Sequence, residues 1–153
     1  MKITDYLKEG GVIPDLQGMD KLSVLKELSL VLVRPYQSPL AEEITEAVLL
    51  REKLGSTGIG EGIAIPHGRL KSFREFIVSF GRSIKGIDFD SMDHQPTHLF
   101  FLVMAPENSA VDNLKLLGRF VTILKNASFK KRLMKARSQE ELFQLIAEED
   151  EKC

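Results

Sequence analysis

The feature that most constrains this chain is the glycine-rich stretch at residues 55–68, which reads GSTGIGEGIAIPHG. Glycine has no Cβ atom, so a segment with five glycines can adopt positive φ angles and approach another group closely. Pro66 lacks an N–H group and favours an extended residue before it, so residues 63–65 are predicted as a short strand that leads to His67. Such a segment either turns tightly or contacts another group.

The residues before this stretch are predicted to form helices after a short N-terminal segment. Residues 3–8 are expected as a short helix, and residues 12–13 begin an extended segment. Asp20 is a suitable N-cap for a helix over 21–33, because leucine recurs at helical spacing along one face of that segment. We expect this leucine face to lie in the core. Its members are Leu22, Leu25, Leu28 and Leu32.

Arg51 continues the apolar stripe of the next predicted helix. Ser38 followed by Pro39 is typical of a helix start, and this helix is expected to run to about Leu54. At about 100° per residue, Arg51 lies almost in line with Ile44 on the apolar face. The negative end of the helix dipole explains part of this placement, and the nearby glycine stretch suggests a bound anion as a second partner. The alternative is an arginine whose stem packs while its charged head reaches water.

Two segments with strand character follow the glycine stretch. Residues 76–84 alternate well enough for a strand, and residues 98–104 form an apolar run typical of a central strand buried on both faces. Helices and strands are interleaved, which favours an α/β fold with helices packed around one sheet. Because the short apolar segments are few and irregularly connected, we predict a mixed β-sheet flanked by helices in one domain over residues 1–153.

Helical patterns occupy the rest of the chain. The predicted helices cover residues 110–125, 129–137 and 138–147. Ser138 opens a capping box at the start of the last one. Asn113 flanks the expected apolar face of the first one. That face consists of Leu114, Leu117, Val121 and Leu124. Residues 148–153 are expected as an acidic, solvated tail outside a core of about residues 3–147.

The composition excludes several classes of partner. Lys and Arg total 21 and Asp and Glu total 22, so no overall field favours nucleic acid or an anionic membrane. No apolar run approaches the roughly 20 residues that span a bilayer, and the N-terminus is not a signal peptide, so we expect no direct membrane insertion. The only cysteine is Cys153, which makes an intrachain disulfide impossible and fits a cytoplasmic protein.

His67 is the one histidine in a conformationally constrained segment. A neutral imidazole is a nucleophile near physiological pH, because its ordinary pKa is about 6.5. A phosphoryl group on an imidazole nitrogen is labile, so one protein can receive it and pass it on when donors face its oxygens. We therefore predict that His67 carries a phosphoryl group. The candidate donors are Arg51, the hydroxyls of Ser56 and Thr57, and the backbone N–H groups around Gly58, Gly60 and Gly62.

Other uses of these residues have less support. The glycine stretch matches neither a Walker A loop nor a dinucleotide-binding fingerprint, and without His67 and Arg51 a plain glycine-rich connection would be the simpler interpretation. The histidines have no cysteine partners, and Pro96 between His94 and His98 prevents a shared helical face, so we predict no metal site. No cofactor is predicted, and no Gly-x-Ser-x-Gly motif indicates a serine hydrolase.

Residues 51–68 closely resemble the signature of the type 2 enzyme IIA domains, the fructose/mannitol class of the bacterial phosphoenolpyruvate-dependent phosphotransferase system (PTS). This class includes the nitrogen-related regulatory IIA proteins. The resemblance extends to residues 86–89 and 99–104, covers most of the chain, and implies a mixed sheet flanked by helices. It also implies that Nε2 of His67 is phosphorylated by the carrier protein HPr or its nitrogen-branch counterpart, and that Arg51 lies beside the phosphoryl group.

The sequence departs from that family at Asn113. Many members have a histidine followed by leucine here, whereas this chain has Asn113 followed by Leu114. An amide can hydrogen-bond an imidazole or a phosphoryl oxygen, but it cannot become cationic. We expect a site that is phosphorylated with an altered phosphohistidine lifetime or transfer rate. The alternatives are an amide that faces water and a domain that no longer takes phosphate.

The resemblance implies a phosphotransferase component that passes its phosphoryl group from His67 to a IIB domain for sugar uptake. The alternative is a stand-alone regulatory protein that binds its targets according to its phosphorylation state. Since residues 1–153 show neither an HPr domain nor a IIB domain, we expect both functions to depend on partner proteins.

Overall fold

The fold is built on a six-stranded mixed sheet, seen in a computed structural model that describes residues 1–33 and 38–153. The strands are β1 (Val12–Ile13), β2 (Gly58–Gly60), β3 (Ile63–Ala64), β4 (His67–Leu70), β5 (Ile77–Ile87) and β6 (Thr97–Pro106). Their order is β1-β5-β6-β3-β2, with β4 also paired to β6. β3 and β4 run parallel to β6, whereas β5 runs antiparallel to it. The prediction of a mixed sheet is therefore confirmed.

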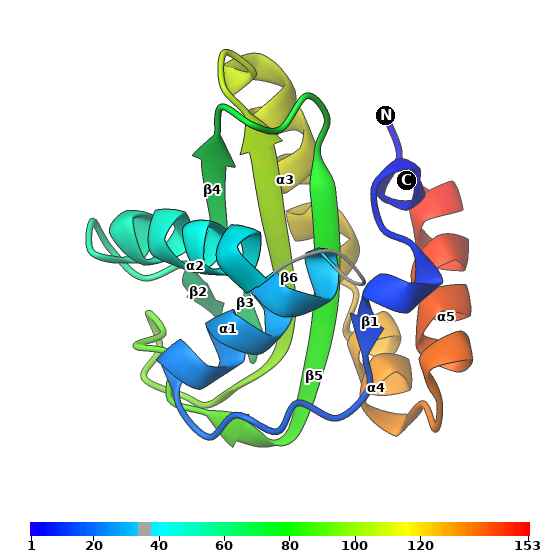
Figure 1. Cartoon of the computed structure of the whole chain (residues 1–153). Coiled ribbons are helices and arrows are strands. Elements are labelled where there is room, and N and C mark those ends of the chain that lie inside the picture. Colours follow the sequence, from blue (N-terminus) through cyan, green and yellow to red (C-terminus); the bar gives the residue numbers. More distant parts are fainter. Residues whose placement is uncertain (34–37) are drawn as a thin grey trace.

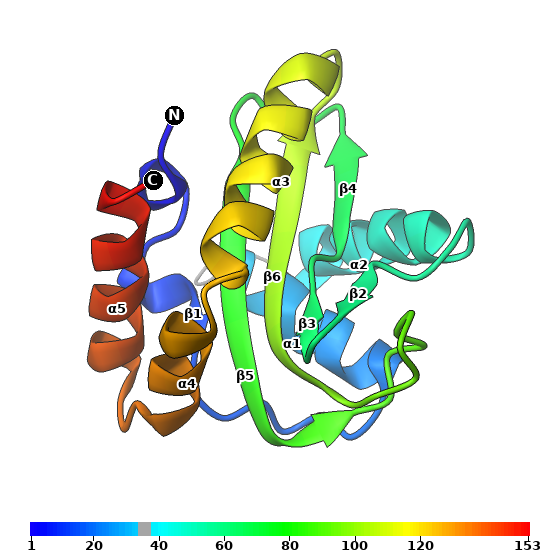
Figure 2. The same ribbon diagram turned by 180° about the vertical axis from the view of Figure 1, so that it is seen from behind.

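Helices cover both faces of this sheet (Figure 1; Figure 2). They are the 3₁₀ helices η1 (Ile3–Asp5) and η2 (Glu9–Gly11), followed by α1 (Lys21–Leu32), α2 (Ser38–Glu52), α3 (Ala110–Leu124), α4 (Ala127–Lys135) and α5 (Gln139–Glu151). α1 and α2 lie on one face, and α3, α4 and α5 lie on the other. The predicted cap at Ser38 concerns a side chain outside the described part of the structure.

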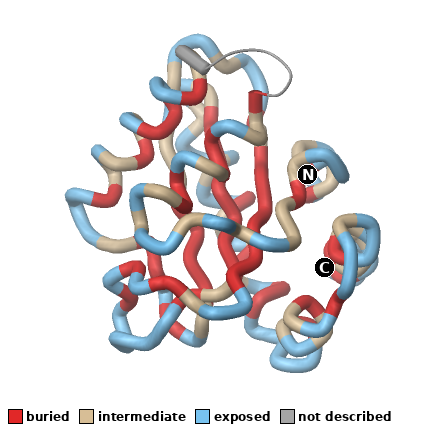
Figure 3. Tube along the Cα trace, turned by 60° about the horizontal axis from the view of Figure 1, so that its bottom comes forward, coloured by how far each residue is buried: buried red, intermediate tan, exposed pale blue. Residues whose placement is uncertain are grey.

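β6 is the central strand, as its apolar run predicted. Every residue from 99 to 105 is buried, and Figure 3 shows burial concentrated along the strands. Alternate side chains of β6 pack against the helices on opposite faces of the sheet, because successive residues of a strand point to opposite faces. Phe100 packs with α1 and α2, while Phe101 lies 4.8 Å from the ring of Phe80 and 4.6 Å from that of Phe120. The sheet therefore separates two apolar cores.

Two predicted helix faces were partly wrong. In α1, Leu25 and Leu28 are fully buried, but Leu22 is 43% exposed. In α3, Leu114 is 72% exposed, and the residues that pack inward are Leu116, Phe120, Ile123 and Leu124. Both helices contain more apolar residues than one face can hold, so periodicity leaves the orientation of the helix about its axis undetermined.

The predicted acidic tail was also wrong. α5 continues to Glu151, and Asp150 within it is fully buried. Arg119 of α3 donates from Nε to Asp150 Oδ1 at 2.7 Å, and the backbone N–H of Thr4 donates to Asp150 Oδ2 at 3.1 Å. A buried carboxylate needs such partners, so Asp150 ties α5 to both α3 and the N-terminal segment.

Within the described ranges, 1–33 and 38–153, no helix combines the length and the apolar character needed to cross a membrane.

Candidate functional site

β4 positions His67 at an edge of the sheet. The strand was not predicted: residues 63–65 were expected to lead to His67, but β3 ends at Ala64 and His67 begins β4. His67 pairs in register with Val103 of β6, whose N–H group donates to the Pro66 carbonyl at 2.9 Å. A proline carbonyl can still accept a ladder hydrogen bond, so Pro66 fits here although it has no N–H group.

Gly68 lets β4 approach α2 closely. A Cβ atom at this position would lie 3.3 Å from the Ala47 carbonyl carbon and 3.4 Å from Ala47 Cβ. Since side chains alternate along a strand, His67 and Arg69 project to the opposite face from Gly68. α2 can therefore lie against β4 while its C-terminal residues reach the surroundings of His67.

One hydrogen bond fixes the chemical state of the His67 ring. Nδ1 lies 2.9 Å from the carbonyl oxygen of Ile65. A carbonyl oxygen can only accept, so Nδ1 carries the hydrogen, and in the neutral ring Nε2 has a free lone pair. Burial lowers the pKa of His67, and the positive charges of Arg51 and Arg69 lower it further, against opposing effects of the Ile65 hydrogen bond and of Glu52. Near neutral pH His67 is thus a neutral nucleophile.

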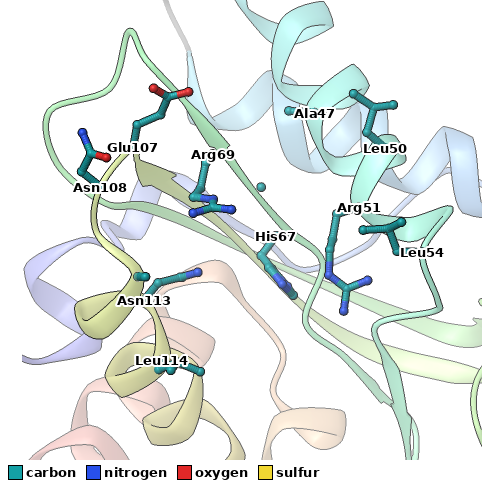
Figure 4. Close-up of a pocket in the computed structure, with 12 residues that line it drawn as sticks. Ala47, Leu50, Arg51, Leu54, His67, Arg69, Glu107, Asn108, Asn113 and Leu114 are labelled. Atoms are coloured by element: carbon teal, nitrogen blue, oxygen red, sulfur yellow. The ribbon is translucent and has the colours of Figure 1, made fainter.

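His67 lines a cavity of about 710 Å³ (Figure 4). The other lining residues are Ala47, Leu50 and Arg51 of α2, Leu54 just after it, Gly68 and Arg69 of β4, and Glu107, Asn108, Ala110, Asn113 and Leu114 around the start of α3. In the close-up, the guanidinium groups of Arg51 and Arg69 lie on different sides of the imidazole. The cavity therefore presents a neutral nucleophile between two cations, which suits an anionic electrophile.

Arg51 reaches this cavity from the last turn of α2. Its Nη1 donates to the Gly55 carbonyl oxygen at 2.8 Å. This bond satisfies a carbonyl just beyond the helix and holds the guanidinium beside the cavity. The structure brings Arg51 and His67 together although they are 16 positions apart in the sequence.

The predicted hydroxyl donors lie elsewhere. Ser56 Oγ donates to the Phe89 carbonyl at 2.7 Å and accepts from the Gly58 N–H group. Thr57 is buried, its hydroxyl bonds to a carboxylate oxygen of Glu52, and its N–H group donates to the other oxygen at 3.0 Å. Neither residue lines the cavity of His67, so these hydroxyls stabilise the loop.

The glycines of the predicted phosphate loop form a hairpin instead. β2 and β3 pair antiparallel, and Gly60 and Gly62 take φ values of 93° and 80° where the chain reverses. Between them, the Glu61 N–H group donates to Asp93 Oδ2 at 2.9 Å. Gly58, Gly60 and Gly62 are absent from the lining of the His67 cavity among the described residues. Tight turning explains Gly60 and Gly62, while at Gly58 a Cβ atom would lie only 3.1 Å from Ser91 Cα.

Asn113 does line the cavity, and its amide nitrogen points toward His67 and Arg69 in Figure 4. Its Oδ1 atom is buried and has no hydrogen-bond partner among the described residues. Arg69 and Glu107 were missed by the sequence reasoning. The two-residue spacing from His67 would have indicated Arg69, but only once residues 67–70 were recognised as a strand.

The other two histidines have separate surroundings. His94 is exposed in a turn, and Nδ1 of His98 lies 2.9 Å from the Ser83 carbonyl oxygen. In the part of the chain that the structure describes, no three His, Cys, Asp or Glu side chains are grouped as a metal site would require.

Comparison with known proteins shows the family of the chain. Residues 5–149 match the family model described as "Phosphoenolpyruvate-dependent sugar phosphotransferase system, EIIA 2". The chain is 36% identical over 150 residues to the fructose-specific EIIABC component of the PTS from Bacillus subtilis, covering 98% of this chain and 24% of that protein. It thus spans about a quarter of that relative. It is 35% identical over 147 residues to a nitrogen regulatory protein of Bradyrhizobium diazoefficiens, covering 96% and 95% of the two chains.

Solved structures show the same relationship. The crystal structure of nitrogen regulatory protein IIA-Ntr from Neisseria meningitidis matches with a TM-score of 0.86 at 30% identity, covering 94% of this chain and 98% of that one. IIA mannitol from Escherichia coli, at 24% identity, shares the fold with a TM-score of 0.76 and covers 92% and 98% of the two chains. The chain therefore belongs to the type 2 EIIA family of the phosphoenolpyruvate-dependent sugar phosphotransferase system.

Proposed function

We propose that this protein is a phosphocarrier that receives a phosphoryl group on Nε2 of His67. The observation that carries the proposal is the free lone pair of Nε2 in a cavity that also holds Arg51. The donor is the phosphohistidine of an HPr-like protein. In the transfer the donor N–P bond breaks, the Nε2–P bond of His67 forms, and the donor imidazole keeps the electron pair of the broken bond.

The rim of the cavity supports docking of a partner protein. Leu50 and Leu54 are 63% and 84% exposed on one side, and Leu114 is 72% exposed on the other. Exposed apolar side chains gathered around a polar site are typical of protein interaction surfaces. The donor and the acceptor would each cover this rim and exclude water from the transferred group.

We propose a IIB domain as the acceptor, with the exchange taking place in the cytoplasm. A solution structure of E. coli enzyme IIAMTL with phosphorylated enzyme IIBMTL matches this chain with a TM-score of 0.75 at 24% identity. That likeness supports a fold able to present His67 to such a domain. In the B. subtilis relative, the matching region is part of a larger EIIABC protein.

A second candidate function is regulation through the phosphorylation state of His67. It is favoured by the nitrogen regulatory protein of B. diazoefficiens, of which this chain covers 95%. An added phosphoryl group carries about −1.5 to −2 charges, enough to change the affinity of a partner that docks on the same rim. Transfer from His67 to a IIB domain with sugar uptake supports transport. A complex that depends on phosphorylation without onward transfer supports regulation.

The deciding experiment is incubation with phosphoenolpyruvate, enzyme I and either HPr or its nitrogen-branch counterpart, followed by intact-mass analysis. We expect an acid-labile increment of one phosphoryl group that is absent in His67→Asn. The variant His94→Asn is the matched control, because His94 is exposed and lies outside the cavity. Absence of the increment in the unmodified protein with both donors would overturn the proposal.

Asn113 is proposed as a neutral donor to a phosphoryl oxygen, through the amide nitrogen that points into the cavity. Replacing it by alanine should shorten the lifetime of the phosphohistidine, and replacing it by histidine should change that lifetime again, because a second imidazole can become cationic. An identical lifetime in all three proteins would show that position 113 does not contact the phosphoryl group.

A further inference from the structure

Arg69 stands two residues after His67 on β4. Neighbouring side chains on one face of a strand are separated by about 7 Å, which places the guanidinium of Arg69 within reach of a group bound to the imidazole. Both residues line the same cavity, and in Figure 4 Arg69 approaches the imidazole from the side away from Arg51. A phosphoryl group on Nε2 would therefore have a cation on two sides.

The guanidinium of Arg69 has no competing partner within the described residues, where no hydrogen bond or ion pair involves it. The two arginines that are most firmly held by the fold show the contrast. Arg82 donates to the carbonyls of Leu133 and Ala136, and Arg119 pairs with Asp150. Arg69 is thus available to bind an anion without losing an interaction of the folded protein.

The charges around the cavity favour a second cation for a bound phosphoryl group. A phosphoryl group adds close to two negative charges. Arg51 contributes one positive charge, Glu107 on the rim contributes a negative one, and Asn113 is neutral. Without Arg69, the lining would offer no net positive charge to a dianion. The positive charge of Arg69 already acts at the imidazole, since it is one of the causes that lower the pKa of His67.

We propose that Arg69 binds the phosphoryl oxygens of phosphorylated His67 and is, with Arg51, the second cation of the transfer site. This inference rests on the proposed function. The strand that carries the nucleophile thereby also carries half of the positive charge that stabilises its phosphorylated form. Arg69 holds the equatorial oxygens during uptake, and it slows loss of the group to water afterwards.

The test compares Arg69→Gln and Arg69→Lys with Arg74→Gln, which removes an exposed cation outside the cavity. The initial rate of phosphoryl uptake from the HPr-like donor and the half-life of the isolated phosphoprotein are measured. We expect Arg69→Gln to reduce the uptake rate by at least about tenfold and to shorten the half-life. Arg69→Lys should recover most of both, and Arg74→Gln should behave as the unmodified protein. Thermal unfolding checks that all variants fold.

A second arm uses potassium phosphoramidate, a small phosphoryl donor, in a His94→Asn background, with the site read by peptide mass. This arm needs no partner protein. If His67 accepts the group only from phosphoramidate, and its half-life depends on Arg69, the carrier function fails but the inference stands. If Arg69→Gln matches the unmodified protein with both donors, the inference is overturned while the carrier function remains.

Discussion

The Nδ1 atom of His67 lies 2.9 Å from the carbonyl oxygen of Ile65, two residues earlier in the chain. The carbonyl belongs to the segment between β3 and β4, which both pair with β6, so its position is fixed by the sheet. The hydrogen bond occupies Nδ1 and orients the ring, which leaves the lone pair of Nε2 free.

This bond predicts the site of modification. Phosphorylated protein should carry the phosphoryl group on Nε2, because attachment at Nδ1 would require the bond to Ile65 to break. Long-range ¹H–¹⁵N correlation spectra of the ¹⁵N-labelled phosphoprotein distinguish the two isomers. A phosphorus-bonded Nδ1 in these spectra would contradict the prediction.

The lowered pKa of His67 predicts a pH dependence of stability. Below its ordinary pKa of about 6.5, an unfolded chain binds a proton at His67 that the folded protein does not bind until its own lower pKa is reached. The free energy of unfolding should therefore fall as the pH drops below about 6.5, and this contribution vanishes above about pH 7.5.

Urea unfolding of the unmodified protein and of His67→Asn at several pH values isolates this contribution. As the pH falls through 6.5, the ordinary pKa of histidine, the unmodified protein should lose more unfolding free energy than His67→Asn does. A difference that is constant with pH would show that the pKa of His67 is not lowered.

The burial of Asp150 predicts that its replacement near the end of the chain lowers the stability of the fold substantially. Asp150→Ala should lower the free energy of unfolding by about 2–3 kcal/mol, because Arg119 and the Thr4 N–H group lose a buried partner. Glu148→Ala, at an exposed position of the same helix, is the control and should change it by less than about 0.5 kcal/mol. Equal changes in unfolding free energy for the two variants would contradict a stabilising role of Asp150 and would favour the solvated tail predicted from the sequence.

The close packing of Gly68 against α2 predicts that Gly68→Ala slows phosphoryl uptake while the protein still folds. In Gly68→Ala the added Cβ would meet Ala47 at 3.3 Å, so β4 must move slightly away from α2 and His67 away from Arg51. We expect phosphoryl uptake to slow by about two- to tenfold and the unfolding free energy to fall by about 1 kcal/mol.

Gly118→Ala provides the comparison for that experiment. Gly118 lies within α3, and a Cβ atom there meets no neighbour within 4 Å. This variant should gain about 0.5–1 kcal/mol of stability, since alanine favours a helix over glycine, and should keep the full uptake rate. An unchanged uptake rate in Gly68→Ala would show that the close approach of β4 to α2 does not set the site.

Local sequence was enough to predict the central strand, the family and the candidate phosphoryl acceptor of this protein. The apolar run at residues 98–104 identified the central strand, because only a strand covered on both faces needs such continuous apolar character. The signature at residues 51–68 identified the family, and the constrained surroundings of His67 made it the candidate phosphoryl acceptor. Each of these features is contained in one short segment, so it can be recognised from the sequence without knowing which segments are neighbours in the fold.

The tertiary structure decided what depends on which segments become neighbours. Leu114 was expected in the apolar core but is exposed to solvent, and Asp150 was expected in solvent but is buried in an ion pair with Arg119. Both differences arise because α3 and α5 are oriented by the elements they pack against. The glycines that were expected to hold an anion form a hairpin. Arg69 joins Arg51 at the cavity only because residues 67–70 form a strand on β6, and that pairing is set by contacts between distant parts of the chain.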